Sequence, residues 1–201
     1  MRYIILLCLA AITIITPLDI FSEEDDQWNE LRKWKKIPDD KIPVLIVRDA
    51  KVSQNQVDIV ENAINSKEVK NSRTLFLGWN EGIKEISKSF GVKVPTLEIQ
   101  YKLESVEAIT IHLKDKSSSN NYNGYTNLFY DKNGNIQRAM ITIYNTDELN
   151  KIEVESIIRH ELGHALGLGH TNKENDLMQP KININYNLIS FLDLKTLANI
   201  Y

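Results

Sequence analysis

Residues 160–170 read HELGHALGLGH and contain three of the four histidines in a chain of 201 residues. Upstream of them, apolar residues recur at helical spacing through Val154 and Ile158. Because His160 and His164 are four residues apart, a helix would project both imidazoles from one face. This spacing suits two ligands of one zinc ion, so the segment predicts a metal-binding helix.

The residues between and after these histidines complete the chemistry. Glu161 lies about 100° around the same helix, where its carboxylate reaches a metal-bound water without binding the metal, and we expect it to act as general base. His170 cannot share the face of His164 if the helix continues. Gly167 predicts a turn, because glycine adopts the left-handed conformation that ends a helix without steric cost, and the turn would return His170 as third ligand.

Three imidazoles and a water form the arrangement of catalytic zinc, whereas structural zinc sites usually have four protein ligands. A helical histidine is usually a surface or core residue, and HExxH alone recurs by accident. In this composition the longer HExxHxxGxxH would arise by chance with a probability on the order of 10⁻⁵, against roughly 10⁻² for the short form. The longer pattern therefore favours a metal site.

The segment resembles the zinc-binding signature of the metzincin metallopeptidases, in which a methionine turn follows the third histidine. Met178, in the run NDLMQP, stands at that turn. Within the metzincins the matrixins fit best, since Thr171 and LMQP are similar to their serine and LMYP. Ser190–Tyr201 resembles their closing helix, with Asp193 at one of its acidic positions. The resemblance covers about Ile136–Tyr201.

This resemblance implies an α+β fold of the metzincin (zincin) type, with a twisted mixed β-sheet, a long zinc-binding helix and a C-terminal helix. It implies a zinc metalloendopeptidase that hydrolyses peptide bonds of protein or peptide substrates through a zinc-activated water, with Glu161 as general base. One catalytic Zn²⁺ would be held by His160, His164 and His170. In the family the edge strand before the zinc helix pairs with an extended peptide, a role that we assign to Ile136–Tyr144.

At four positions this sequence departs from the matrixin pattern, which limits the properties that the resemblance implies. Gln179 replaces the usual tyrosine, so no tyrosine there can act as metal ligand or oxyanion donor. Ile182 stands where matrixins often have another tyrosine in the wall of the primed-side pocket. His112 is the only other histidine, so we assign it to an ordinary strand and expect no structural zinc. Cys8, the lone cysteine, lies too early to be the propeptide cysteine that blocks the metal in latent animal enzymes.

The rest of the chain shows strand and helix periodicity without repeats. Asn150 and Glu153 have the spacing of a helix-capping box and predict the start of the zinc helix. Strands are expected at Pro43–Val47, Leu97–Tyr101, Ala108–Leu113 and Ile136–Tyr144, and helices at Gln54–Asn65 and Leu75–Phe90.

Asn133 and Gly134 predict a tight hairpin with a strand on each side. Asp131, Asn133 and Asn135 also have the spacing of calcium-loop oxygens. The glycine comes one position early, however, and Thr142 stands where the loop needs an acidic ligand. Calcium is therefore only weakly supported, and the hairpin is preferred.

The first 22 residues are typical of an export segment, because Arg2 precedes the apolar run Tyr3–Ile15. That run is shorter than the roughly 20 residues of a spanning helix, which favours a cleaved signal peptide and a secreted, extracellular protein. A retained signal anchor, with the protein membrane-anchored and facing outside, is the alternative. Residues 23–40 are dense in charge and are expected to be a linker, which assigns the catalytic domain to 41–201.

Composition excludes other classes of protein. A net charge of −3 and the absence of a basic patch with interleaved aromatics argue against a nucleic-acid partner. A hydrophobic content of 42% supports one domain with a real core. The competing hypothesis is a catalytically inactive, zinc-stabilised surface binding module. Glu161 argues against that module, since a purely structural zinc site has no use for the carboxylate.

Overall fold

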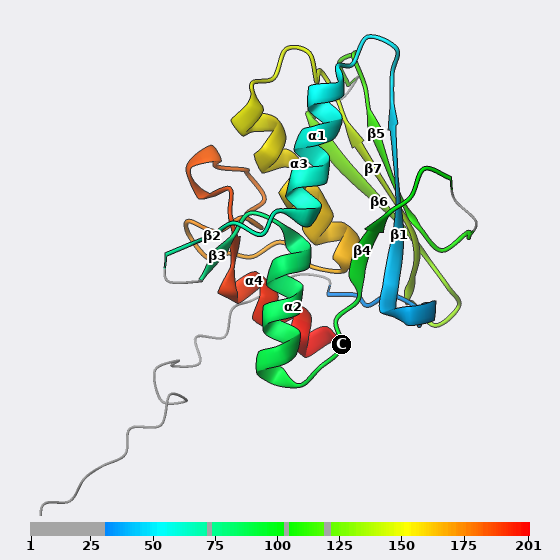
Figure 1. Ribbon diagram of the computed structural model, residues 1–201, viewed down its shortest axis with the longest axis vertical. Coiled ribbons are helices and arrows are strands. Elements are labelled where there is room, and N and C mark those ends of the chain that lie inside the picture. Colours follow the sequence, from blue (N-terminus) through cyan, green and yellow to red (C-terminus); the bar gives the residue numbers. More distant parts are fainter. Residues whose placement is uncertain (1–30, 72–73, 103–104, 119–121) are drawn as a thin grey trace, which may run out of the picture.

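The computed structural model describes residues 31–71, 74–102, 105–118 and 122–201 (Figure 1). Its main sheet has the strand order β4-β1-β5-β7-β6, with β6 antiparallel to β7 and all other neighbours parallel. The strands are β1 (Lys41–Arg48), β4 (Thr96–Ile99), β5 (Ile109–Leu113), β6 (Gly124–Tyr130) and β7 (Ile136–Ile143).

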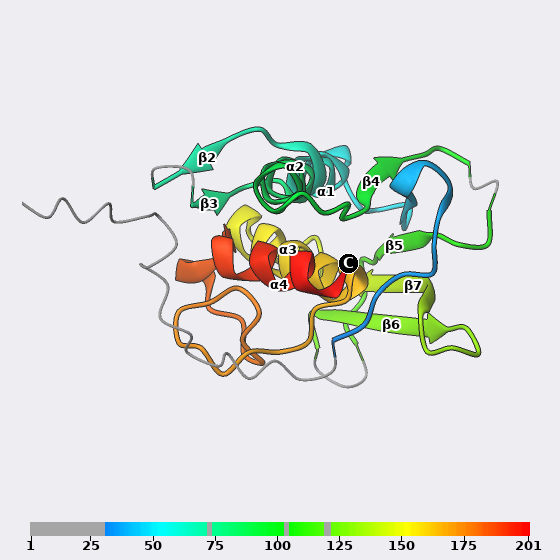
Figure 2. The ribbon, with the colours of Figure 1, turned by 90° about the horizontal axis from the view of Figure 1, so that it is seen from below.

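The helices gather on one face of this sheet, as Figures 1 and 2 show. In β5 the side chains of Ile109, Ile111 and Leu113 are buried and alternate with less buried neighbours, so only the face toward the helices belongs to the core. The helices are α1 (Gln54–Asn65), α2 (Trp79–Phe90), α3 (Lys151–Leu166) and α4 (Phe191–Ile200). This is the mixed α+β architecture that the sequence predicts.

A second, small sheet joins distant parts of the chain. It contains β2 (Val69–Lys70), β3 (Leu75–Phe76) and β8 (Ile189–Ser190) in that order. The prediction of one helix over Leu75–Phe90 is therefore wrong at its start. Leu75–Phe76 pairs with β8 near the C-terminus, a long-range contact that the local periodicity cannot reveal. Short 3₁₀ turns, η2 (Pro38–Asp40) and η3 (Ile184–Tyr186), complete the described elements.

The other predicted elements lie at their expected places, with bounds shifted by one or two residues. The hairpin between β6 and β7 is confirmed, with Gly134 at φ 78° and Asp131 Oδ1 accepting hydrogen bonds from the Asn133 and Asn135 amides at 2.8 and 2.9 Å. Ile136–Tyr144 is a strand, but the prediction that it lies at the edge is wrong. β7 is enclosed by β5 and β6, and β6 is the edge strand.

Part of the segment that the sequence assigns to a charged linker lies against the domain. Trp34 is only 4% exposed, and its indole Nε1 donates to the Ala165 carbonyl of α3 at 2.7 Å. Its backbone neighbours bridge to Ile136, the first residue of β7. The segment thus contacts both α3, through the Trp34 indole, and the start of β7, through its backbone.

Within the described ranges, no helix combines the length and the apolar character that crossing a bilayer requires. The predicted signal peptide or anchor, residues 1–22, lies outside the described residues.

Replacing Trp34 by alanine removes a buried ring and its hydrogen bond to α3. We expect the free energy of unfolding, measured by urea denaturation, to fall by about 3–5 kcal/mol. Tyr101→Ala serves as the control, because Tyr101 is 94% exposed and its loss should change stability by less than about 0.5 kcal/mol. A Trp34→Ala variant as stable as the wild type would contradict the packing of this segment.

Candidate metal centre

Helix α3 begins and ends on contacts that the sequence predicts. Asn150 Oδ1 accepts from the Glu153 amide at 3.1 Å, and Glu153 Oε2 accepts from the Asn150 amide at 2.8 Å, which forms the capping box. At the other end Gly167 has φ 111°. A Cβ there would collide with the carbonyl of Arg32, so position 167 excludes larger residues by sterics as well as by conformation.

The turn at Gly167 brings the three histidines together. His164 Nε2 lies 3.0 Å from His160 Nε2 and 3.2 Å from His170 Nε2. Zinc–nitrogen bonds of 2.0–2.1 Å in tetrahedral geometry place ligand nitrogens about 3.3 Å apart, close to this spacing. Within the described residues, these three side chains are the only cluster of at least three histidine, cysteine or carboxylate groups with metal-ligand spacing.

The hydrogen bonds of the Nδ1 atoms of His160 and His164 show whether a cation fits between the Nε2 atoms. His160 Nδ1 lies 2.8 Å from the Leu177 carbonyl and His164 Nδ1 lies 2.9 Å from the Leu168 carbonyl. A carbonyl oxygen only accepts, so both Nδ1 atoms carry the hydrogen and both Nε2 atoms of the neutral rings present lone pairs. Lone pairs facing each other at 3.0 Å repel unless a cation lies between them, so the donor set fits zinc.

Burial keeps the rings neutral. It lowers the pKa of His160 to about 3, with a further contribution from His164, and it lowers the pKa of His164 to about 4. The pKa of His170 is lowered by burial as well. Neutral imidazole is the form that binds a metal ion.

Glu161 points from α3 toward the edge strand. It is 5% exposed, and burial raises the pKa of its carboxyl to about 7 although a hydrogen bond from Thr126 opposes the shift. Thr126 Oγ1 donates to Glu161 Oε2 at 2.5 Å. Gly124, two residues earlier on β6, leaves room for the carboxylate, since a Cβ there would lie 2.9 Å from Oε1. Sequence reasoning missed both residues, because only the pairing of distant segments brings them to Glu161.

An open groove of about 1190 Å³ runs past these residues. Its lining includes all three histidines and Glu161. Residues of β6, the two residues before it and the segment 180–182 with Ile184 also line the groove, and Ile182 is among them. The apolar and aromatic residues that line the groove include Tyr122, Tyr125, Leu128, Leu149, Ile157 and Ile182.

Met178 lies in a turn directly beneath the zinc helix. Its side chain is fully buried, and a Cβ on Gly163 of α3 would lie 2.5 Å from Met178 Sδ, so only glycine allows the turn to approach this closely. The turn is closed by a hydrogen bond from the Thr171 amide to the Met178 carbonyl at 3.0 Å. The same turn supplies the Leu177 carbonyl that orients His160.

Comparison with known protein families decides the classification. A family model described as matrixin matches residues 24–201. The chain belongs to the matrixin family. The metzincin and matrixin resemblance drawn from the motif is thereby confirmed, and the family implies a zinc metalloprotease.

Two solved structures of zinc proteases or metalloproteinases resemble this matrixin distantly. High choriolytic enzyme 1, a hatching-enzyme zinc protease from the medaka fish Oryzias latipes, is 16% identical, with 71% of this chain and 55% of that chain covered and a TM-score of 0.33. Metalloproteinase-II from Bacteroides fragilis is 11% identical, with 87% and 59% covered and a TM-score of 0.39. The matrixin chain thus spans less than two thirds of either protein. No curated protein matches it.

A buried pair of carboxyl groups joins the methionine turn of this matrixin to α4. Asp176 Oδ1 accepts from the Met178 amide at 2.9 Å, while Asp193 caps α4 through the Ser190 amide at 2.7 Å. The Ser190 hydroxyl lies between them, 3.3 Å from Asp176 Oδ2 and 2.9 Å from Asp193 Oδ2. Burial raises the pKa of both carboxyls, most strongly that of Asp193, to which the neighbouring Asp176 also contributes. The hydrogen bond from the Met178 amide is the main effect that opposes the shift at Asp176.

Zinc content tests the metal centre. His164→Ala removes the imidazole that lies closest to both others, so we expect bound zinc, measured by atomic emission after dialysis, to fall from about one ion per chain to a small fraction of that. His112→Ala is the matched control, since His112 lies in β5 outside the cluster. Full zinc in His164→Ala, or loss of zinc in His112→Ala, would contradict this assignment.

The carboxyl pair predicts a pH dependence of stability. Because the folded-state pKa values lie above the ordinary value of 3.8, the folded protein binds more protons than the unfolded chain, and the free energy of unfolding falls as pH rises above that value. Asp193→Asn removes one ionising group from the pair. We expect this variant to lose less stability than the wild type between acidic and neutral pH in urea denaturation at a series of pH values.

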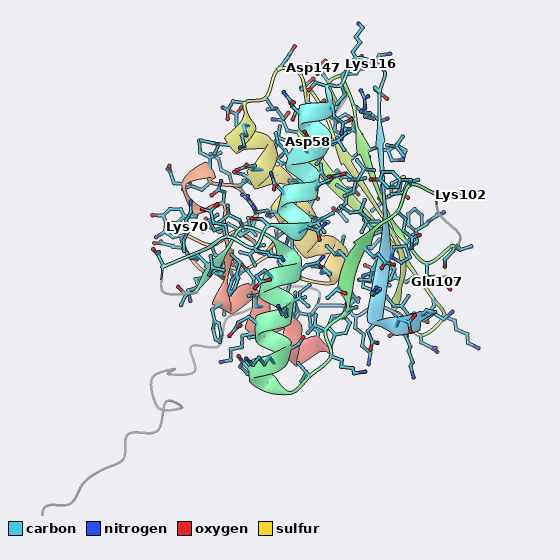
Figure 3. The ribbon with its side chains drawn as sticks, viewed as in Figure 1. Asp58, Lys70, Lys102, Glu107, Lys116 and Asp147 are labelled. Atoms are coloured by element: carbon cyan, nitrogen blue, oxygen red, sulfur yellow. The ribbon has the colours of Figure 1, made fainter. Side chains whose placement is uncertain are left out.

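The control for this experiment is Asp147→Asn, at an exposed position that lies at the edge of the molecule in Figure 3. Its pH profile should follow that of the wild type. An Asp193→Asn profile as steep as the wild-type profile would contradict the assignment of this pH dependence to the carboxyl pair.

Proposed function

We propose that this matrixin is a zinc-dependent endopeptidase that hydrolyses peptide bonds of protein substrates. The observation that carries the proposal is the convergence of three neutral imidazole rings beside a buried carboxylate, all of which line an open groove. Here His160, His164 and His170 hold the metal. Bound zinc supplies the Lewis acid that polarises the scissile carbonyl and the attacking water.

The chain's own residues carry the proton transfers. Glu161 takes a proton from the attacking water as the water oxygen bonds to the carbonyl carbon, and the carboxylate becomes a carboxylic acid. It then gives that proton to the leaving nitrogen as the carbon–nitrogen bond breaks. Burial favours this role, because it raises the pKa of Glu161 to about 7, which lies near neutral pH.

The edge strand β6 provides the place for the substrate backbone. Its inner edge pairs with β7, and within the described residues no other strand pairs with its outer edge. An extended peptide can add to that edge through main-chain hydrogen bonds, while the groove receives its side chains. β6 therefore takes the substrate-pairing role that sequence reasoning assigned to Ile136–Tyr144.

The alternative function is a zinc-stabilised binding module without turnover. Gln179 and Ile182, which depart from the family pattern in and after the methionine turn, are the residues that favour it. Glu161 argues against it, because burial of this carboxylate raises its pKa, and ionisable groups perturbed in this way cluster at functional sites. We also propose that the protein is exported through residues 1–22, since matrixins are typically extracellular.

Turnover on an unstructured protein such as casein tests the enzyme proposal. Purified protein should cleave it, lose cleavage on chelation and regain it with stoichiometric zinc. Glu161→Gln removes the proton acceptor while keeping the shape, so kcat/KM should fall by about 10²–10⁴-fold with zinc content unchanged. Exposed Glu174→Gln is the control and should cleave normally. Cleavage by Glu161→Gln at the wild-type rate would refute the mechanism.

A further inference from the structure

The edge strand β6 approaches helix α3 unusually closely at Glu161. Gly124 and Thr126 are two residues apart on the strand, so both face the same side of the sheet. A Cβ on Gly124 would collide with Ile157 Cγ2 of α3 and would lie 2.9 Å from Glu161 Oε1. The side chain of Thr126 reaches the other carboxylate oxygen, Oε2. Two neighbouring positions of one strand therefore surround the carboxylate.

The contact between Thr126 and Glu161 is a strong hydrogen bond. A threonine hydroxyl has one hydrogen to donate, and Oγ1 lies 2.5 Å from Glu161 Oε2 but 3.2 Å from the Glu161 carbonyl oxygen. Hydroxyl–carboxylate bonds of 2.5–2.7 Å are the charge-assisted kind. In the part of the chain that the structure describes, no hydrogen bond reaches Oε1. The two oxygens of Glu161 are thus distinguished, one anchored and one free.

We propose that Thr126 is a positioning residue for Glu161: its hydroxyl holds Oε2 and leaves Oε1 as the oxygen that takes the proton from the attacking water. The inference rests on the proposed endopeptidase function. A general base must lie within hydrogen-bond reach of the proton it removes, and a carboxylate held by one oxygen loses the rotational freedom that would carry the other out of reach.

The position of Thr126 also links substrate binding to the chemistry. Thr126 is paired in register with Ile141 of β7, so its backbone is held by the interior of the sheet. The outer edge of the same strand is the one to which we assign the substrate. One rigid strand would then carry both the peptide and the group that orients the base, which keeps the water and the scissile carbonyl at a constant distance from Oε1.

The experiment distinguishes the effect of the Thr126 hydroxyl from the effect of the size and branching of its side chain. Thr126→Val keeps the branched side chain and removes the donor, so kcat should fall by about 10–100-fold while KM changes by less than about 2-fold. Thr126→Ser keeps the hydroxyl and removes only the methyl group, so kcat should stay within about 3-fold of the wild type. Zinc content is measured for each variant and should match the wild type. Thermal unfolding checks that Thr126→Val is folded at the assay temperature, although its midpoint should fall because a buried carboxylate has lost a hydrogen bond.

Thr142→Val is the matched control. Thr142 lies on the adjoining strand β7 between the buried Ile141 and Ile143, so its side chain is on the face away from α3. The same chemical change there should leave kcat unaltered. A role of Thr126 in packing alone would make the serine variant at least as damaging as the valine variant, which reverses the expected order.

Wild-type kcat in Thr126→Val, or an equal loss of kcat in Thr126→Ser, overturns this inference. If the inference about Thr126 fails in this way but Glu161→Gln is inactive in the same assay, the proposed endopeptidase function still stands. If the wild type itself shows no chelator-sensitive cleavage, the proposed function fails and the inference fails with it.

Discussion

The orientation of two imidazole rings by backbone carbonyls is the interaction on which the rest of this structure depends. With Nδ1 of His160 donating to the Leu177 carbonyl and Nδ1 of His164 to the Leu168 carbonyl, both Nε2 lone pairs are directed at one point. Those carbonyls belong to the segment that follows α3. The turn at Gly167 and the turn around Met178 are therefore required for the ligand geometry of the helix itself.

The carbonyls have to be held in their turn, and the chain does so with buried polar contacts. Asp176 accepts the Met178 amide, and Ser190 and Asp193 join that turn to the start of α4. Burying two carboxyl groups side by side is costly for stability, as their raised pKa values indicate. These contacts hold the backbone around Met178, which carries the Leu177 carbonyl that orients His160.

The second constraint is the close approach of β6 to α3. Gly124 allows the approach, and residues of β6 line the groove. Because β6 is at the edge of the sheet, its outer backbone groups have no partner strand in the described residues. The side chain of Thr126 therefore connects the proposed general base, Glu161, directly to β6, the strand whose outer edge we assign to the substrate.

Features that depend on neighbouring residues were predictable. The 3.6-residue period, the capping box at Asn150 and the glycine at 167 are local, so the helix, its ends and the return of His170 follow from spacing and backbone sterics alone. Failures occurred where the partner is distant in sequence. The start of α2 was misplaced because Leu75–Phe76 pairs with β8. The edge strand was misassigned because a hairpin shows that two strands adjoin but not which one lies outside.

By itself, the sequence predicted the proposed metal ligands and the neighbouring carboxylate, because HExxHxxGxxH specifies both residue type and position on a helix. It also determined the α+β class, through the two periodicities. Only the tertiary structure decided the tautomers of His160 and His164, the residues that surround Glu161, and the strand with a free edge. The physical reason is that hydrogen bonds from Leu177, Leu168 and Thr126 cross between segments whose proximity is a property of the packed chain.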